Sequence, residues 1–231
     1  CWLATIYWMD MRSSIMLSFR TTTISYIFII FLWATNGSAT VRYEYIDNYT
    51  SGYARFGGYA FIRESEEIYM TERLEQMKQL VDSVLKRVGL YSPEAAELVF
   101  LTGLVESKYK YLYQIGGPAR GYFQVEPFTA WDICINYLSF RRSEAKTYAR
   151  ALNLEEEVLI YPTEELMEEM LADNIALGIL LCRLKYYRVP HPLPKDTDGM
   201  AAYWKQFYNA GGKGTVKHFL ETVDVAQKGK I

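Results

Sequence analysis

The chain has 231 residues, half of them hydrophobic, and a formal net charge of −2 at pH 7. This length can bury the core of one ordinary domain plus an appendage, and the near-neutral charge gives no indication of a nucleic-acid partner. The sequence holds two histidines and no CxxC, HExxH or GxSxG pattern, which argues against a zinc site and a serine-hydrolase site. An enzyme of this composition is therefore expected to work with carboxylates, tyrosines and amides, and without a cofactor.

The N-terminal segment, residues 1–39, has the parts of a secretory signal peptide. Arg12 and Arg20 precede an apolar run at residues 24–34, and the small residues Gly37 and Ala39 follow it. We expect cleavage after Ala39, because the run is short for a bilayer span. An uncleaved anchor that contacts the membrane through residues 24–34, or an ordinary apolar helix, are the alternatives. Either of the first two readings places the rest of the chain outside the cytosol, in the periplasm or cell envelope.

Residues 40–70 are rich in tyrosine and glycine and show no helical period. We expect an extended arm or a few short strands there. Residues 71–231 are predicted to form one mostly helical domain.

The first two helices of that domain have clear start and stop signals. Thr71 is a predicted N-cap for a helix that Gly89 ends, and Ser92 with Pro93 opens the next one. Further helices are predicted over residues 128–140 and 144–151, from Thr163 to just before Pro190, from Asp198, and from Thr215. Residues 116–124 are too short and glycine-rich for a helix and are predicted to form a loop or small hairpin.

Glu106 is the candidate catalytic residue. It shares one face of the second helix with Ala95, Val99 and Thr102, at the helix C-terminal end. Apolar surroundings and the negative pole of the helix both disfavour ionisation of a carboxyl group. An acid that keeps its proton near neutral pH is what cleavage of a glycosidic bond requires of a general acid.

Four motifs occur in order along the chain. They are Glu106-Ser107, the stretch 119–130 (ARGYFQVEPFTA), the stretch 173–178 (DNIALG) and the stretch 208–211 (YNAG). They resemble the motifs of the lysozyme-like lytic transglycosylases, relatives of goose-type lysozyme that are common in bacteriophage particles. Residues 201–205 and 212–215 also resemble a phage-encoded branch of that group.

The resemblance implies an α+β, lysozyme-like fold: a helical bundle around a substrate cleft, with a small loop or β patch. It implies cleavage of the β-1,4 bond between MurNAc and GlcNAc in peptidoglycan, with Glu106 as acid and then base and a 1,6-anhydromuramoyl product. The implied cleft residues are Ser107, Tyr122, Gln124, Glu126, Tyr208 and Asn209. Peptidoglycan strands are the implied partner, together with virion proteins if the chain belongs to a phage particle.

Two alternatives stay open. Hydrolysis normally uses two carboxylates, and a hydrolytic lysozyme would need Glu126 or Asp132 beside Glu106. A binding or structural virion protein could keep the fold without the reaction. Cys134 and Cys182 lie in apolar segments and are expected to be buried free thiols, with a disulfide between them as the alternative in an exported protein.

Overall fold

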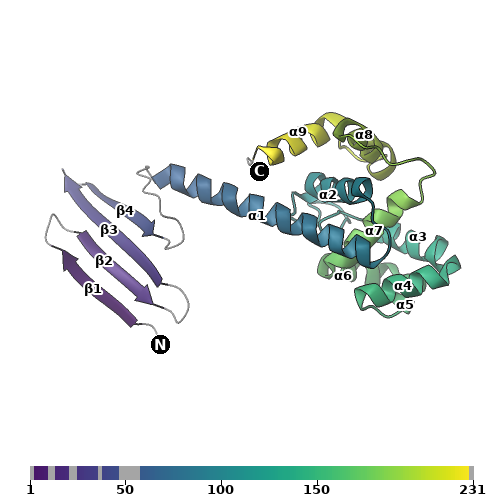
Figure 1. Ribbon diagram of the computed structural model, residues 1–231, viewed down its shortest axis with the longest axis horizontal. Helices are drawn as coiled ribbons and strands as arrows, with labels where there is room; N and C mark the ends of the chain where they lie inside the picture. The colour runs from purple at the N-terminus through teal and green to yellow at the C-terminus, as the bar shows by residue number, and fades with distance from the viewer. Residues whose placement is uncertain (1–2, 10–13, 21–24, 36–37, 47–57, 229–231) are drawn as a thin grey trace. The chain divides into compact units, whose positions relative to one another are not determined.

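The computed structural model describes the backbone of residues 3–9, 14–20, 25–35, 38–46 and 58–228, and the side chains of residues 71–228. The chain divides into two compact units, Cys1–Glu66 and Glu67–Ile231. Helices dominate the described residues, as the sequence predicts (Figure 1).

The first unit contains an antiparallel sheet with the strand order β1-β2-β3-β4. Its strands are β1 (Leu3–Met9), β2 (Ser14–Arg20), β3 (Ser25–Thr35) and β4 (Ser38–Ile46). The predicted signal-peptide run falls on β3, where Ile30 pairs with Ile15 of β2 and Tyr43 of β4. The run thus forms a strand, and the alternative of an ordinary apolar helix is wrong. Export of the protein and contact of this run with a membrane stay predictions. Among the described helices, none combines the length and apolar character that a bilayer crossing needs.

Helix α1 (Gly58–Arg87) begins well before the predicted N-cap at Thr71, which lies inside it. The prediction of an arm over residues 40–70 is therefore wrong for Gly58–Met70 and right in part for β4, while residues 47–57 lie outside the described residues. The stretch after Gly58 contains alanine, arginine and several glutamates, which are good helix formers and outweigh its tyrosines. The predicted end is confirmed, because Gly89 has a φ of 71° just beyond the helix.

Eight further helices and two short turns follow α1 within the described part of the second unit. They are α2 (Pro93–Ser107), α3 (Pro127–Asn136), the 3-10 turn η1 (Leu138–Phe140), α4 (Arg142–Leu152), α5 (Glu157–Ile160), α6 (Glu164–Asp173), α7 (Ile175–Tyr187), α8 (Thr197–Tyr203), the π turn η2 (Trp204–Tyr208) and α9 (Val216–Gln227). The predicted caps Ser92, Thr163 and Thr215 each accept a hydrogen bond from a backbone N–H of the first turn.

The long helix predicted after Thr163 is two helices. Asn174 has extended backbone angles and ends α6, and its side chain accepts a hydrogen bond from Leu177 N at 2.9 Å to cap α7. An asparagine side chain competes well for a first-turn N–H, so it starts a new helix where the apolar pattern alone continues.

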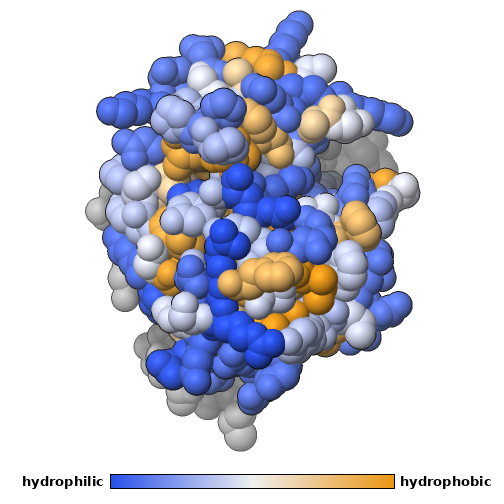
Figure 2. Space-filling model, turned by 90° about the vertical axis from the view of Figure 1, so that its right-hand side faces the viewer, coloured by the Kyte–Doolittle hydropathy of each residue, from blue (hydrophilic) through white to orange (hydrophobic). Residues whose placement is uncertain are grey.

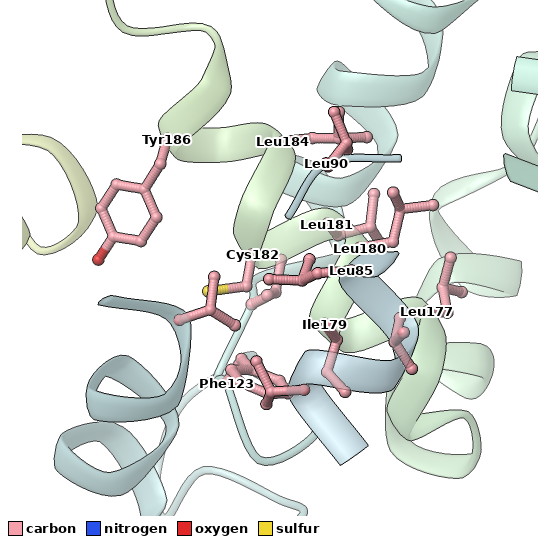
Figure 3. Close-up of a cluster of buried hydrophobic side chains, with 14 of the residues drawn as sticks. Leu85, Leu90, Phe123, Leu177, Ile179, Leu180, Leu181, Cys182, Leu184 and Tyr186 are labelled. Atoms are coloured by element: carbon pink, nitrogen blue, oxygen red, sulfur yellow. The ribbon is translucent and has the colours of Figure 1, made fainter. Parts of the chain in front are cut away.

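Helix α7 lies at the centre of the core (Figure 3). Its residues from Leu177 to Leu184 are all buried, and Leu85 of α1 and Phe123 of the loop before α3 pack in the same cluster. Cys182 of α7 and Cys134 of α3 are buried free thiols, as expected, and form no disulfide. A helix that is apolar all round is typical of a core position, and α7 thus serves as the support for its neighbours.

The surface is mostly hydrophilic on the face that Figure 2 shows. The hydrophobic residues on this face lie in separate patches. Scattered apolar residues are normal on the surface of a folded protein, and these patches by themselves indicate no partner.

Candidate active site

Helix α2 positions Glu106 at the boundary between core and surface. The helix is buried along nearly its whole length, and Glu106 in its last turn is partly exposed. Thr102, one turn earlier on the same face, has its Oγ1 2.8 Å from the hydroxyl of Tyr186 on α7. This contact fixes the rotation of α2 about its axis, and with it the direction in which Glu106 leaves the helix.

The loop after α2 turns back on the helix around Tyr109. Lys108 and Tyr109 both have positive φ angles, 54° and 52°. The Tyr109 ring is fully buried, and its hydroxyl donates a hydrogen bond to Phe100 O at 2.7 Å. Gly103 makes the ring's position possible, because a Cβ at Gly103 would lie 2.6 Å from the ring. The chain is thereby directed across the end of α2.

The glycine-rich segment forms a tight hairpin next to the end of α2, in agreement with the prediction. Arg120 and Val125 exchange backbone hydrogen bonds of 3.0 and 3.1 Å. Gly121 has a φ of 69°, and a Cβ on it would lie 2.4 Å from Leu171 O of α6. Gln124 also has a positive φ, 46°, and its Nε2 donates to Gly121 O at 2.8 Å, which closes the turn. The hairpin is therefore held both by its own hydrogen bonds and by α6.

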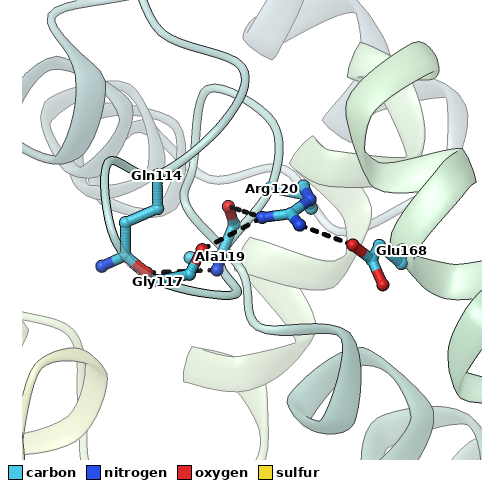
Figure 4. A network of polar contacts seen from close by, with 5 residues as sticks. All are labelled: Gln114, Gly117, Ala119, Arg120 and Glu168. Atoms are coloured by element: carbon cyan, nitrogen blue, oxygen red, sulfur yellow. Dashed lines mark hydrogen bonds and ion pairs between the residues drawn. The ribbon is translucent and has the colours of Figure 1, made fainter.

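A network around Arg120 stiffens the far side of this loop (Figure 4). Nη1 of Arg120 donates to the carbonyl oxygens of Gly117 and Ala119, and Nη2 forms an ion pair with Glu168 of α6. Oε1 of Gln114 accepts a hydrogen bond from Ala119 N at 3.2 Å. A hollow of about 350 Å³ lies beside this network, lined by Tyr113, Arg120, Glu165, Glu168, Glu169, Ala172 and Asp173. Glu106 is not among its lining residues, so this hollow is separate from the candidate acid.

The π turn η2 brings two side chains to Glu106. Asn209 N donates to Trp204 O at 2.9 Å, five residues earlier, which marks the wider turn. One extra residue per turn places positions five apart on the same side of the helix, and such turns are frequent at functional sites. Accordingly, Nε1 of Trp204 donates to Glu106 Oε1 at 2.9 Å, and Nδ2 of Asn209 lies 3.5 Å from the same oxygen.

The electrostatic environment of Glu106 favours its protonated form. Burial raises the pKa of Glu106 above its ordinary value, and the hydrogen bonds from Trp204 and Asn209 and the charge of Lys185 lower it in part. Both hydrogen bonds are donated to Oε1, so Oε2 has no hydrogen-bond donor among the described residues. The carboxyl group can thus present an O–H to a ligand while its other oxygen is held in place.

The other polar atom of the Asn209 side chain, Oδ1, accepts no hydrogen bond from the described residues. This oxygen is also buried. A buried acceptor without a partner is costly, and a ligand hydroxyl or a water can satisfy it. Gly212 leaves room for this amide, because a Cβ at Gly212 would lie 2.2 Å from Oδ1.

Two predicted cleft residues have internal positions instead. Ser107 is 2% exposed, and its hydroxyl donates to Tyr122 O at 2.7 Å, so it ties the hairpin to α2 and does not face a ligand. Tyr208 is also buried, and its hydroxyl donates to Phe123 O at 2.7 Å. Their prediction as substrate-contacting residues is corrected to a role in holding the hairpin, since buried polar groups bond to protein where water is absent.

Three other residues that the sequence singled out lie on the hairpin or on α3. Tyr122 is partly exposed and accepts a hydrogen bond from Arg73 Nη2 at 3.3 Å. Glu126 is exposed at the start of α3, and its charge acts on Lys185. Asp132 is paired with Arg188 at 2.8 Å and accepts from Asn136, interactions that lower its pKa and keep it in an ion pair. Glu126 is therefore the better placed of the two candidate second carboxylates.

Trp204 and Lys185 belong to the site and were missed as site residues in the sequence. Trp204 is almost fully buried and would pass for a core residue, although it lies in the stretch 201–205 that the motif comparison singled out. Lys185 lies near the end of an apolar helix that also carries Arg183, and nothing in the sequence distinguishes the two cations. Only the π turn and the packing of α7 reveal what Trp204 and Lys185 contact.

The described residues contain no cluster of histidine, cysteine, aspartate and glutamate side chains that could hold a metal ion. Comparison of the chain with protein-family models, with curated proteins and with solved structures finds no match. The geometry around Glu106 is therefore the basis for any functional assignment.

Proposed function

We propose that the protein is a peptidoglycan lytic transglycosylase, with Glu106 as its general acid and base. The observation that carries the proposal is a carboxyl group of raised pKa at the end of a buried helix, held through one oxygen by Trp204 and Asn209. A general acid needs a proton to give and a fixed direction in which to give it. The four motifs that resemble the lytic transglycosylases add the substrate, a MurNAc-GlcNAc β-1,4 bond.

The expected steps use the groups beside Glu106. Protonated Oε2 gives its proton to the glycosidic oxygen, the bond breaks, and the carboxylate then takes a proton from the C6 hydroxyl of the muramoyl residue as that hydroxyl attacks C1. The leaving sugar gains the proton and the 1,6-anhydro ring forms without water. Export or delivery in a virion, which the proposed substrate requires, belongs to the same proposal.

The competing reaction is hydrolysis with a second carboxylate. Glu126 is the candidate that favours it, because its charge and that of Glu106 act on the same Lys185 ammonium. It is exposed, however, whereas Glu106 is partly buried and held by hydrogen bonds from Trp204 and Asn209. A single engaged carboxyl group favours attack by the substrate's own hydroxyl over a two-carboxylate mechanism.

Mass spectrometry of the products separates these possibilities. The full chain is incubated with purified peptidoglycan, and the released muropeptides are analysed beside those from Glu106→Gln. The proposal predicts anhydro-ended muropeptides from the wild type alone. Reducing ends would instead identify a hydrolytic lysozyme and direct attention to Glu126. Binding to peptidoglycan without any released product would identify a binding or structural protein.

A further inference from the structure

Lys185 is the one charged side chain that acts on Glu106 among the described residues. The other titratable groups on which the Glu106 charge acts are Cys182 and Tyr186 of α7 and Tyr208 of η2. Burial raises the pKa of all three well above neutral, so they carry no charge at physiological pH. Lys185 is therefore the one positive charge in the described part of the chain that stabilises a negative charge on Glu106, in addition to the hydrogen bonds from Trp204 and Asn209.

The Lys185 ammonium is held in a fixed place by Tyr208. Nζ donates a hydrogen bond to Tyr208 O at 2.9 Å and lies 4.0 Å from the centroid of the Tyr208 ring. The ring is in turn stacked on Tyr186, with centroids 5.3 Å apart. A cation over an aromatic face is stabilised by the ring electrons, and the stabilisation grows where water is excluded. Lys185 thus joins α7 to the peptide group between Tyr208 and Asn209.

No carboxylate forms an ion pair with Lys185 within residues 71–228. A direct ion pair with Glu106 would keep that carboxylate permanently ionised and unfit to donate a proton. A cation held nearby on another partner acts differently. It stabilises the anion formed when Glu106 has given up its proton, and it does not occupy the oxygens.

We propose that Lys185 is a positioning residue of the Glu106 site: its ammonium fixes the Tyr208–Asn209 backbone and supplies the positive charge that stabilises the Glu106 carboxylate after proton transfer. The part of this inference that concerns catalysis rests on the proposed function. The charge coupling between the two side chains exists independently of any substrate, however, and is measured without one.

The test is an NMR titration of the Glu106 carboxyl carbon in the full chain, with the signal assigned by its loss in Glu106→Gln. Lys185→Met removes the charge and is expected to shift the Glu106 midpoint to higher pH, because the anion loses its compensating cation. Lys185→Arg keeps the charge and is expected to bring the midpoint back toward the wild-type position. A purely structural role for Lys185 would not produce this ordering of midpoints.

Lys205→Met is the matched control. Lys205 Nζ also donates to backbone carbonyl oxygens of this region, those of Asn209 and Gly212, each at 2.9 Å. Its charge is not among those that shift the pKa of Glu106. Lys205→Met is therefore expected to leave the Glu106 midpoint in place. An unchanged midpoint in Lys185→Met, or an equal shift in Lys205→Met, overturns the proposal.

The reciprocal titration covers the case in which Lys185→Met does not fold. Coupling between two sites acts equally in both directions, so Glu106→Gln is expected to shift the Lys185 ammonium midpoint to lower pH. A Lys185 midpoint that does not move in Glu106→Gln also overturns the proposal. Failure of the proposed function would give a different result. Glu106→Gln would then retain lytic activity, while the Lys185 substitutions would still shift the Glu106 midpoint.

Discussion

At the scale of the residue, Glu106 is subject to opposing influences on one carboxyl group. Burial disfavours its charged form, whereas Trp204, Asn209 and Lys185 favour it. Burial is the largest of these, so the pKa is raised. A group with a raised pKa in the folded state keeps its proton to a higher pH than an ordinary glutamate, which is the direction of shift that a general acid requires.

This raised pKa predicts how the stability of Glu106→Gln depends on pH. An acid with a higher pKa folded than unfolded stabilises the fold fully below the unfolded pKa, and that contribution is lost as pH rises through the folded pKa. Glutamine does not titrate, so the variant is expected to gain stability relative to the wild type as pH increases.

Urea unfolding of both proteins at about pH 4 and about pH 8 measures this difference. The free energy of unfolding of Glu106→Gln, relative to that of the wild type, is expected to be larger at the higher pH. A relative stability that stays constant, or that falls with pH, would mean that the Glu106 pKa is not raised. Glu97→Gln on the same helix serves as the control, because Glu97 lies in a surface ion pair with Lys78.

At the scale of the element, the π turn η2 decides which side chains meet Glu106. A regular α-helix through residues 204–209 would carry Trp204 and Asn209 to different sides. The wider turn places both on the same carboxyl oxygen, and Lys185 holds the carbonyl oxygen at its end. The glycines that follow leave the space into which the Asn209 amide fits.

Gly212→Ala is expected to displace Asn209 with little cost in stability. The added Cβ would lie 2.2 Å from Asn209 Oδ1, at the end of a side chain that can turn away. Because that turn removes the amide from Glu106, we expect lytic activity to fall while the thermal midpoint stays close to the wild type. Peptidoglycan turbidity and thermal unfolding measure the two quantities.

The neighbouring glycine supplies the control for this variant. A Cβ at Gly211 would meet nothing within 4 Å. Gly211→Ala is thus expected to retain activity and stability. Equal activity in the two variants would show that the position of the Asn209 amide has no importance for the reaction.

At the scale of the whole molecule, the sequence is a good guide to helices and a poorer one to the site. Caps such as Ser92 and Thr163 were predictable because their signal is local. The early start of α1 was not predictable, because the tyrosines near residue 58 are poor indicators of a helix. The break at Asn174 was not predictable either, because the apolar pattern continues through it.

For the site, the helix pattern indicated that Glu106 lies at the edge of the core. The motifs singled out Asn209, whose side chain contacts Glu106. The internal positions of Ser107 and Tyr208 depend on how the hairpin packs against α2 and η2, which no spacing in the sequence encodes. Lys185 and Trp204 reach the site only through tertiary packing. Local chemistry was therefore predictable, and contacts between distant segments were not.

The most direct test of the central claim is the initial rate of peptidoglycan solubilisation by Glu106→Gln, compared with the wild type and with Glu97→Gln. Removal of a general acid is expected to lower the rate by about 10²–10⁴-fold, while the control keeps the wild-type rate. Folding of each variant is checked by circular dichroism, so that a lost rate reports chemistry. A wild-type rate in a folded Glu106→Gln would contradict the assignment of Glu106 as the acid.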